Sequence, residues 1–177
     1  MEQLRMVWKK GEVPGIPDIK GVALRTFDGS DKDIGIWLDI VAEGLTDGRE
    51  DEAFFRSCMY GHGVLEFDKF FIIECEGEPA ATIAVICDYE KKDGYIHMVA
   101  CKEKFRGRGI GNYMNAVAVR TLISAGMETA YLTTDDFRIP AIKSYLKAGF
   151  YPDIPDGEHK QRWDAVFDII NESKALK

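Results

Sequence analysis

The sequence has no apolar run close to the roughly 18 residues that cross a bilayer, and its first residues lack the apolar core of a signal peptide. We therefore expect a cytoplasmic protein that makes no membrane contact. Positive charge is also scarce, because 23 basic residues stand against 30 acidic ones and give a net charge of −7. General nucleic-acid binders have a basic surface, so nucleic acid is not an expected partner.

Paired cysteines and clustered histidines are absent as well. Cys58, Cys75, Cys87 and Cys101 form no C-x-x-C pair, and the three histidines are scattered along the chain. We therefore predict no metal site and four reduced cysteines, which act as structural side chains. The sequence also has no internal repeat and no low-complexity segment.

The chain of 177 residues, 46% of them hydrophobic, is long enough for one well-buried core and short for two. We predict a single domain over residues 1–177. Within it, residues 1–20 form an edge strand and a loop, residues 21–170 form the core, and residues 171–177 form a tail.

Hydrophobic periodicity predicts a mixed α+β fold. Residues 70–75, 81–89 and 95–101 are three strands separated by turn signals, which indicates an antiparallel meander. Residues 129–134 form a strand that is reached through a helix and is therefore expected to lie parallel to strand 95–101. A first core strand is expected at 21–27 and a short strand at 150–151. Helices are expected at 30–45, 51–60, 110–125, 140–148 and 163–170.

A basic, glycine-rich loop precedes the helix that starts at Ile110. Gly107, Gly109 and Gly111 let the backbone turn sharply and leave its N–H groups uncovered, while Arg106 and Arg108 add positive charge. The N-terminus of a helix carries unpaired N–H groups and partial positive charge. The loop therefore predicts a site for a polyanion such as a phosphate group, although a purely structural turn is also compatible with it.

The spacing of the loop excludes the two best-known nucleotide loops. No Gly-Lys-Ser/Thr tripeptide is present, and Asn112 stands where a dinucleotide fingerprint from Gly107 needs glycine. The segment Arg106 to Gly111 instead reads R-x-x-G-x-G, which resembles the coenzyme A loop of the GNAT acetyltransferase superfamily. Downstream, Ala141 to Phe150 resembles the family signature A-[IV]-x-x-Y-x-K-x-G-F. Together the two motifs favour a GNAT protein.

The resemblance implies a mostly antiparallel twisted sheet, a parallel strand pair flanking a cofactor cleft, and helices on both faces. It implies acetyl-coenzyme A as cosubstrate, with catalytic roles for a main-chain donor near Val99, at the thioester carbonyl, and for the hydroxyl of Tyr145, at the leaving thiolate. The residues implied in cofactor binding are Val99, Ala100, Cys101, Arg106, Gly107, Arg108, Gly109, Ile110, Gly111, Asn112, Arg138 and Tyr145.

Several assignments have an alternative. Arg138 occupies the position where the family often has a cofactor-binding Asn, and it can reach a phosphate or pair with an aspartate. Tyr145 also fits a buried core tyrosine. His97 is a candidate general base or a packed histidine, and Asp135 and Asp136 are candidate bases or turn residues. The sequence does not assign the base.

The leading hypothesis is an N-acetyltransferase that moves the acetyl group of acetyl-coenzyme A directly to a primary amine of a small molecule or peptide. A non-catalytic acyl-coenzyme A binding or sensing module is the main alternative. A nucleotide-binding protein unrelated to acyl transfer is disfavoured, since the required loop motifs are missing. The acceptor amine is not identified, and both a monomer and a homodimer are compatible with the sequence.

Overall fold

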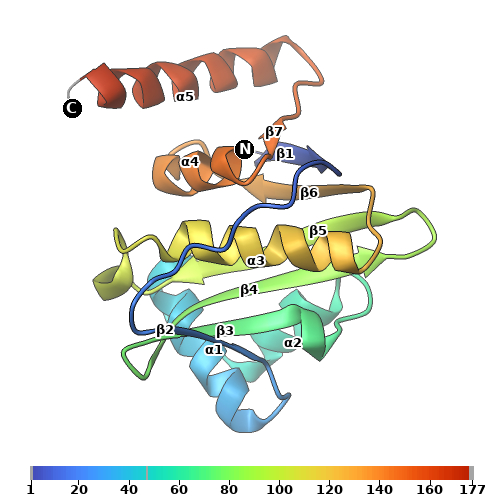
Figure 1. Ribbon diagram of the computed structural model, residues 1–177, viewed down its shortest axis with the longest axis vertical. Coiled ribbons are helices and arrows are strands. Elements are labelled where there is room, and N and C mark those ends of the chain that lie inside the picture. The colour runs from blue at the N-terminus through green and yellow to red at the C-terminus, as the bar shows by residue number, and fades with distance from the viewer. Residues whose placement is uncertain (1, 47, 176–177) are drawn as a thin grey trace.

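The computed structural model describes residues 2–46 and 48–175. Seven strands form one sheet in the order β2-β3-β4-β5-β6-β1-β7 (Figure 1). All neighbouring strands are antiparallel except β5 and β6, which are parallel. This arrangement confirms the predicted fold class. The strands are β1 Leu4–Lys9, β2 Val22–Thr26, β3 Phe70–Cys75, β4 Glu78–Asp88, β5 Asp93–Cys101, β6 Thr129–Thr134 and β7 Tyr151–Pro152.

Helices cover both faces of the sheet, as expected. Helices α1 (Asp31–Gly44) and α2 (Glu52–Tyr60) lie behind it in Figure 1, and α3 (Ile110–Ser124) lies in front. Helix α4 (Ile139–Lys147) packs on α3, and α5 (Gly157–Ala175) packs on α4. Short 3₁₀ turns are found at Phe67–Lys69 and Glu103–Phe105. None of the helices in the described ranges is both long and apolar enough to cross a membrane.

The alternation of side chains along β3 explains the two layers. Phe71 and Ile73 point into the core shared with α3, whereas Phe70 and Ile72 point into the core shared with α1 and α2. Successive residues of a strand face opposite sides of the sheet, so an apolar run with no polar alternation is buried on both faces.

The helix starts follow local capping chemistry. The hydroxyl of Ser30 accepts a hydrogen bond from the Asp33 N–H, and the carboxylate of Asp51 accepts one from the Phe54 N–H. Each bond satisfies a donor that has no partner inside the helix. The predicted helix beginning at Ser30 is confirmed, and the helix predicted at 51–60 begins at Glu52, with Asp51 as its cap.

Two strands occupy other places than predicted. Strand β1, expected at the edge, lies between β6 and β7, because Val7 also pairs with Tyr151 after the chain returns from α4. Strand β2, expected in the core, forms the opposite edge, and Leu24 on it is 38% exposed. Strand order depends on long-range pairing that neither local sequence displays.

The C-terminal helix is longer than its apolar pattern. The pattern that starts at Trp163 predicts a helix over 163–170, but α5 spans Gly157–Ala175. The first turns of α5 are mostly exposed and therefore show no hydrophobic periodicity. Most of the predicted tail is thus helical, and residues 176–177 lie outside the described residues.

Candidate active site

Strand β5 carries a bulge just before the glycine loop. Thr82 of β4 pairs with Ala100 and Ala84 pairs with His97, so β5 contains one more residue than β4 between these pairs. Met98 within the bulge has a φ of 52°, in the left-handed region. A bulge bends the strand and interrupts its ladder, which here redirects the backbone at Val99.

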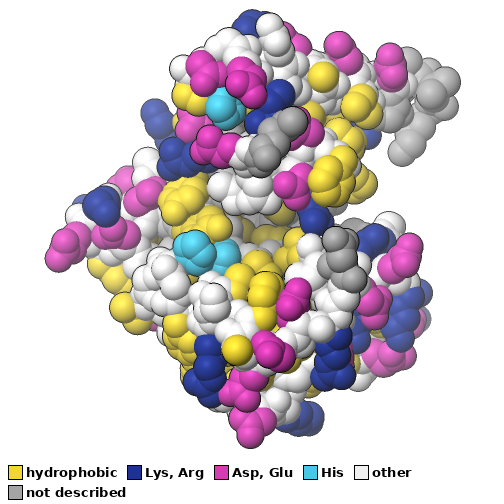
Figure 2. Space-filling model, turned by 180° about the vertical axis from the view of Figure 1, so that it is seen from behind, with side chains coloured by type: hydrophobic (Ala, Val, Ile, Leu, Met, Phe, Trp, Pro, Cys, Tyr) yellow, Lys and Arg dark blue, Asp and Glu magenta, His cyan; other side chains and the backbone are white. Residues whose placement is uncertain are grey.

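Strands β5 and β6 separate beyond their first three residue pairs. Their parallel pairing ends at Tyr95 and Tyr131. A cavity of about 280 Å³ lies where they diverge, lined by β5 from Tyr95 to Val99, by β6 from Leu132 to Thr134, and by Ala141 and Tyr145 of α4. Figure 2 shows hydrophobic and histidine side chains around a hollow in the middle of the face behind that of Figure 1.

The glycine loop leaves the start of α3 open. Gly107 has a φ of 76° and Gly109, the N-cap of α3, has a φ of 86°, values that glycine adopts without steric cost. No side chain caps this helix. The first backbone N–H groups of α3 therefore have no side-chain partner of this kind, which is the arrangement that an anion site at a helix N-terminus needs.

The basic side chains of the loop contact the protein itself. Arg106 donates hydrogen bonds to the carbonyl oxygens of Cys101 (3.2 Å) and Glu43 (2.9 Å), and so joins the end of β5 to the end of α1. Lys104 pairs with Glu78, and Arg108 lies 3.5 Å from Glu76. The Lys104 and Arg108 pairs are exposed and contribute little stability, so both cations can exchange their carboxylate for a phosphate.

Tyr145 is almost completely buried and lines the cavity. Burial raises the pKa of Tyr145 to about 12, because the phenolate is poorly solvated there. The hydroxyl therefore keeps its proton throughout the physiological range. This protonation state suits a proton donor, and it also suits a core tyrosine.

A buried polar network connects the glycine loop to the helix of Tyr145. Asn115 on α3 donates a hydrogen bond to the Ser144 hydroxyl (2.8 Å), and that hydroxyl donates to the Asn112 side chain (3.1 Å). Asn115 is 2% exposed. Sequence reasoning missed this network, although a polar residue at a buried helical position was a signal for it. The network holds the first turn of α3 against α4.

Arg138 bridges the two sides of the cavity. Its guanidinium contacts the Asp135 carboxylate (2.9 Å) and donates a hydrogen bond to the Gly44 carbonyl oxygen (2.8 Å) at the end of α1. The second carboxylate oxygen of Asp135 accepts a hydrogen bond from Gln3 (3.1 Å). Of the two possibilities left by the sequence, the structure shows the pairing with an aspartate.

His97 is a buried, neutral imidazole at the cavity wall. It is 6% exposed, and its Nε2 lies 3.1 Å from the carbonyl oxygen of Cys58 on α2. A carbonyl oxygen only accepts, so Nε2 carries the proton and Nδ1 keeps a free lone pair. Burial is the main cause that lowers the pKa of His97 to about 4, and the neighbouring His62 contributes in the same direction.

This buried histidine predicts a loss of stability in mild acid. Between pH 6.5 and 4 the unfolded chain binds a proton at residue 97 that the folded chain does not, so stability falls as pH falls. Between pH 6.5 and 4, His97 should cost the wild type up to about 3 kcal/mol of unfolding free energy, and the His97→Asn variant should not show this loss. Urea unfolding at a series of pH values measures it, with His159→Asn on α5 as the control. Equal pH profiles for the wild type and His97→Asn would contradict the prediction.

Asp136 serves the scaffold. Its carboxylate accepts a hydrogen bond from Arg162 Nε (2.9 Å) on α5, and this bond lowers the pKa of Asp136. Asp136 does not line the cavity, so it is a poor candidate for a general base. The four cysteines are free thiols, and no group of His, Cys, Asp or Glu within residues 2–46 and 48–175 has the arrangement of a metal site.

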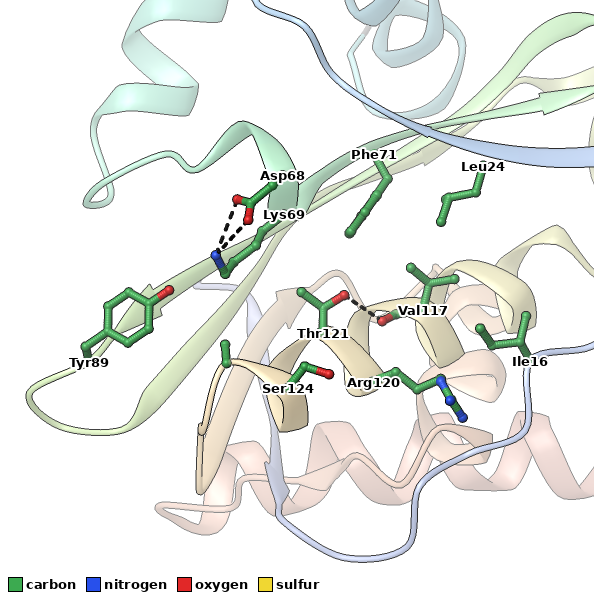
Figure 3. Close-up of a pocket in the computed structure, with 11 residues that line it drawn as sticks. Ile16, Leu24, Asp68, Lys69, Phe71, Tyr89, Val117, Arg120, Thr121 and Ser124 are labelled. Atoms are coloured by element: carbon green, nitrogen blue, oxygen red, sulfur yellow. Dashed lines mark hydrogen bonds and ion pairs between the residues drawn. The ribbon is translucent and has the colours of Figure 1, made fainter.

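A second and larger cavity, of about 500 Å³, lies between α3 and the β2–β4 side of the sheet (Figure 3). Several of its polar side chains are engaged with the protein: Lys69 contacts Asp68, and the Thr121 hydroxyl donates to the Val117 carbonyl oxygen (2.9 Å). None of its lining residues belongs to the glycine loop or to the bulge of β5. We therefore assign the candidate active site to the smaller cavity.

A mixed sheet in which one parallel pair diverges around a cavity is the fold of GNAT N-acetyltransferases. The model of the acetyltransferase (GNAT) family matches residues 36–150, and the chain belongs to this family. The expectation drawn from the two sequence motifs is thereby confirmed.

Three similar proteins give context. The chain is 28% identical over 140 residues to a mycothiol acetyltransferase of Streptomyces bingchenggensis, an alignment covering 77% of this chain and 44% of the relative. A GCN5-related N-acetyltransferase from Sphaerobacter thermophilus superimposes with a TM-score of 0.66 at 19% identity, covering 85% of this chain and 49% of that one. The chain thus spans under half the length of both proteins.

The third is Arabidopsis thaliana Naa50 in complex with the bisubstrate analogue CoA-Ac-MVNAL. It superimposes with a TM-score of 0.59 at 19% identity, covering 77% of this chain and 85% of Naa50. At this identity the likeness concerns the fold.

Proposed function

We propose that this protein is an acetyl-coenzyme A-dependent N-acetyltransferase that acts by direct transfer to a primary amine. The observation that carries the proposal is the cavity between β5 and β6. Val99 and Tyr145 both line it, and the glycine loop leads from the end of β5 to the uncapped start of α3. Family membership supports acyl transfer as the reaction.

The residues present fit the cosubstrate. The N–H groups from Arg106 to Asn112 suit a pyrophosphate, since a helix N-terminus favours negative charge. The edge of β5 that faces β6 is paired only as far as Tyr95, and beyond Tyr95 no strand within the described ranges pairs with it. That edge from Val99 to Cys101 offers main-chain donors and acceptors to the amide groups of a pantetheine arm, although the Cys101 carbonyl oxygen already accepts from Arg106.

Acetyl-coenzyme A, when bound, supplies an acetyl group activated as a thioester. The main-chain donor at Val99 stabilises negative charge on the carbonyl oxygen while the amine nitrogen bonds to the carbonyl carbon and the carbon–sulfur bond breaks. The Tyr145 hydroxyl gives its proton to the departing sulfur. A free amine with a pKa near ~10 must first lose a proton, and His97 Nδ1 and the Asp135 carboxylate are the candidate acceptors at the cavity.

Two measurements test the proposal. Calorimetric titration with coenzyme A is expected to show saturable binding, and incubation with acetyl-coenzyme A and a panel of amines is expected to release thiol in proportion to acetylated amine. Absence of coenzyme A binding at high micromolar protein would overturn the proposal. Binding without turnover of any amine would favour the sensing module.

Alanine at Gly107 is expected to weaken coenzyme A binding about tenfold, a loss of ~1.4 kcal/mol. A side chain in the left-handed region costs about 1–2 kcal/mol, and the loop relieves this cost by turning its N–H groups away from the pyrophosphate. Calorimetry measures the dissociation constant.

Gly126→Ala is the matched control for this prediction. Gly126 has a φ of 79° against 76° at Gly107, and a Cβ at either residue meets no atom within 4 Å. Both variants should lose similar stability, but Gly126 follows α3 and lies outside the loop. Equal dissociation constants for the two variants would contradict a role for the loop in binding.

A further inference from the structure

The cavity joins the two faces of the sheet. Tyr145 belongs to the core on the face of α3 and α4, whereas His97, from the other wall, contacts Cys58 of α2 on the opposite face. The glycine loop leads into α3, so the cosubstrate occupies the α3 end of the passage under the proposed function. The α2 end is left for the acceptor amine.

Aromatic rings form the wall at the α2 end. Tyr95 and His97, whose ring centroids are 4.9 Å apart, both line the cavity, as does Phe54 of α2. Tyr131 stacks on Tyr95 at 4.7 Å with the planes inclined by 15°. His62 completes the cluster, 5.5 Å from the ring of Tyr95. The rings of Tyr95, His97, Tyr131 and His62 thus pack against one another beside the cavity.

The faces of these rings are largely occupied. The ring of Tyr131 has Tyr95 against one face and the Arg5 guanidinium 4.5 Å from its centroid. Tyr95 is covered by Tyr131 on one side and approached by His62 with planes inclined at 65°. Ring faces attract cations, whereas ring edges carry partial positive charge and attract the π face of another ring. Tyr131 and one face of Tyr95 are thus already covered, so the wall lacks the open ring faces that a cation cage needs and suits packing against another aromatic ring.

The charges of the cavity point the same way. Asp135 carries the one carboxylate among the described residues that line it, and Gln3 and Arg138 already bind both of its oxygens. A polyamine or aminoglycoside needs free carboxylates for its extra ammonium groups. The volume of about 280 Å³, just below the usual range for ligand pockets, also favours a small acceptor.

We propose that the acceptor is a small primary monoamine that carries an aromatic ring. The ring docks against Tyr95 and Phe54, and the amine nitrogen points between the strands toward Val99 and Tyr145. This assignment rests on the proposed function and specifies its substrate class. In the reaction the amine nitrogen replaces sulfur on the acetyl carbon, and the products are an N-acetyl arylalkylamine and free coenzyme A.

The test compares 2-phenylethylamine with 2-cyclohexylethylamine, which has the same chain length and a similar volume but no π system. We expect kcat/KM to favour the aromatic amine by about threefold to tenfold. Tyr95→Leu should abolish this preference, and Tyr95→Phe, which retains the ring, should preserve it. Tyr60→Leu, a change at an exposed tyrosine of α2 outside the cavity, is the control.

Binding of both amines to the protein saturated with coenzyme A, measured by calorimetry, separates the two proposals. Tyr95-dependent binding of the aromatic amine without turnover would support the acceptor site and reject the transferase. A different outcome is that the enzyme turns over the cyclohexyl amine, spermidine or a peptide N-terminus as efficiently as the aromatic amine. That result would reject the proposed acceptor class but would leave the proposed transferase activity intact. Failure of the aromatic amine in both assays would overturn the inference.

Discussion

Replacing Tyr145 by phenylalanine is expected to lower kcat about 100-fold or more while the affinity for coenzyme A stays within about twofold. A positioned proton donor contributes roughly 10²–10⁴-fold to a rate, and the substitution removes only the hydroxyl that would protonate the departing sulfur. The ring stays in the core, where Tyr145 packs 6.3 Å from Phe150 between centroids. Thiol release under saturating acetyl-coenzyme A measures kcat, and calorimetry measures the affinity.

Tyr151→Phe provides the control for this prediction. Tyr151 is 41% exposed on β7 and does not line the cavity, so the loss of its hydroxyl should leave the rate unchanged. An unchanged kcat in Tyr145→Phe would assign that residue to the core and leave the sulfur to be protonated by solvent. A sensing module would have no rate to lose.

The alkaline limb of the rate profile tests the same role. Because the pKa of Tyr145 is raised to about 12, its hydroxyl remains protonated well above the ordinary tyrosine pKa of 10. Activity that depends on this proton should therefore not decline between pH 8 and 10. A group with an ordinary tyrosine pKa would begin to lose its proton in that interval.

The sequence predicted those features that depend on local chemistry. The Ser30 cap, the hairpin turn before β4 and the glycine loop leading into α3 are each encoded within a few neighbouring residues. The parallel pairing of β5 and β6 also followed, because a helical crossover between strands leaves few topologies. These features place the loop and Tyr145 on adjacent elements.

Other features of the candidate site depend on partners far apart in the chain. The bulge at Met98 has no glycine, proline or asparagine to indicate it, although its φ is 52°. Arg138 binds the Gly44 carbonyl oxygen across 94 residues, and His97 binds the Cys58 carbonyl oxygen across 39. Since a backbone carbonyl is present at every residue, no pattern of side chains reveals which one an arginine or histidine will reach.

Removal of the Asp33 carboxylate is expected to destabilise the fold by about 3 kcal/mol, the lower end of the range for breaking a buried ion pair. Asp33 is 2% exposed and receives two hydrogen bonds from Arg25, of 2.7 and 2.8 Å. The hydrogen bond with Asp33 raises the pKa of Arg25, and Arg25 also contacts Glu74 at 3.1 Å. Because Arg25 is one-third exposed, water can hydrate its guanidinium once the Asp33 carboxylate is gone. The expected destabilisation therefore lies at the lower end of the range for a buried ion pair.

Asp31→Ala separates this pair from a general charge effect. Both aspartates lie in the first turn of α1, where a negative charge stabilises the helix by roughly 0.3–1 kcal/mol, but Asp31 is exposed. Urea unfolding should therefore show a loss below about 1 kcal/mol for Asp31→Ala and about 3 kcal/mol for Asp33→Ala. Similar losses would mean that the ion pair adds nothing beyond the helix dipole. Because α1 ends at the cavity, where Arg106 and Arg138 bind its last carbonyl oxygens, Asp33→Ala should also raise the KM for the acceptor.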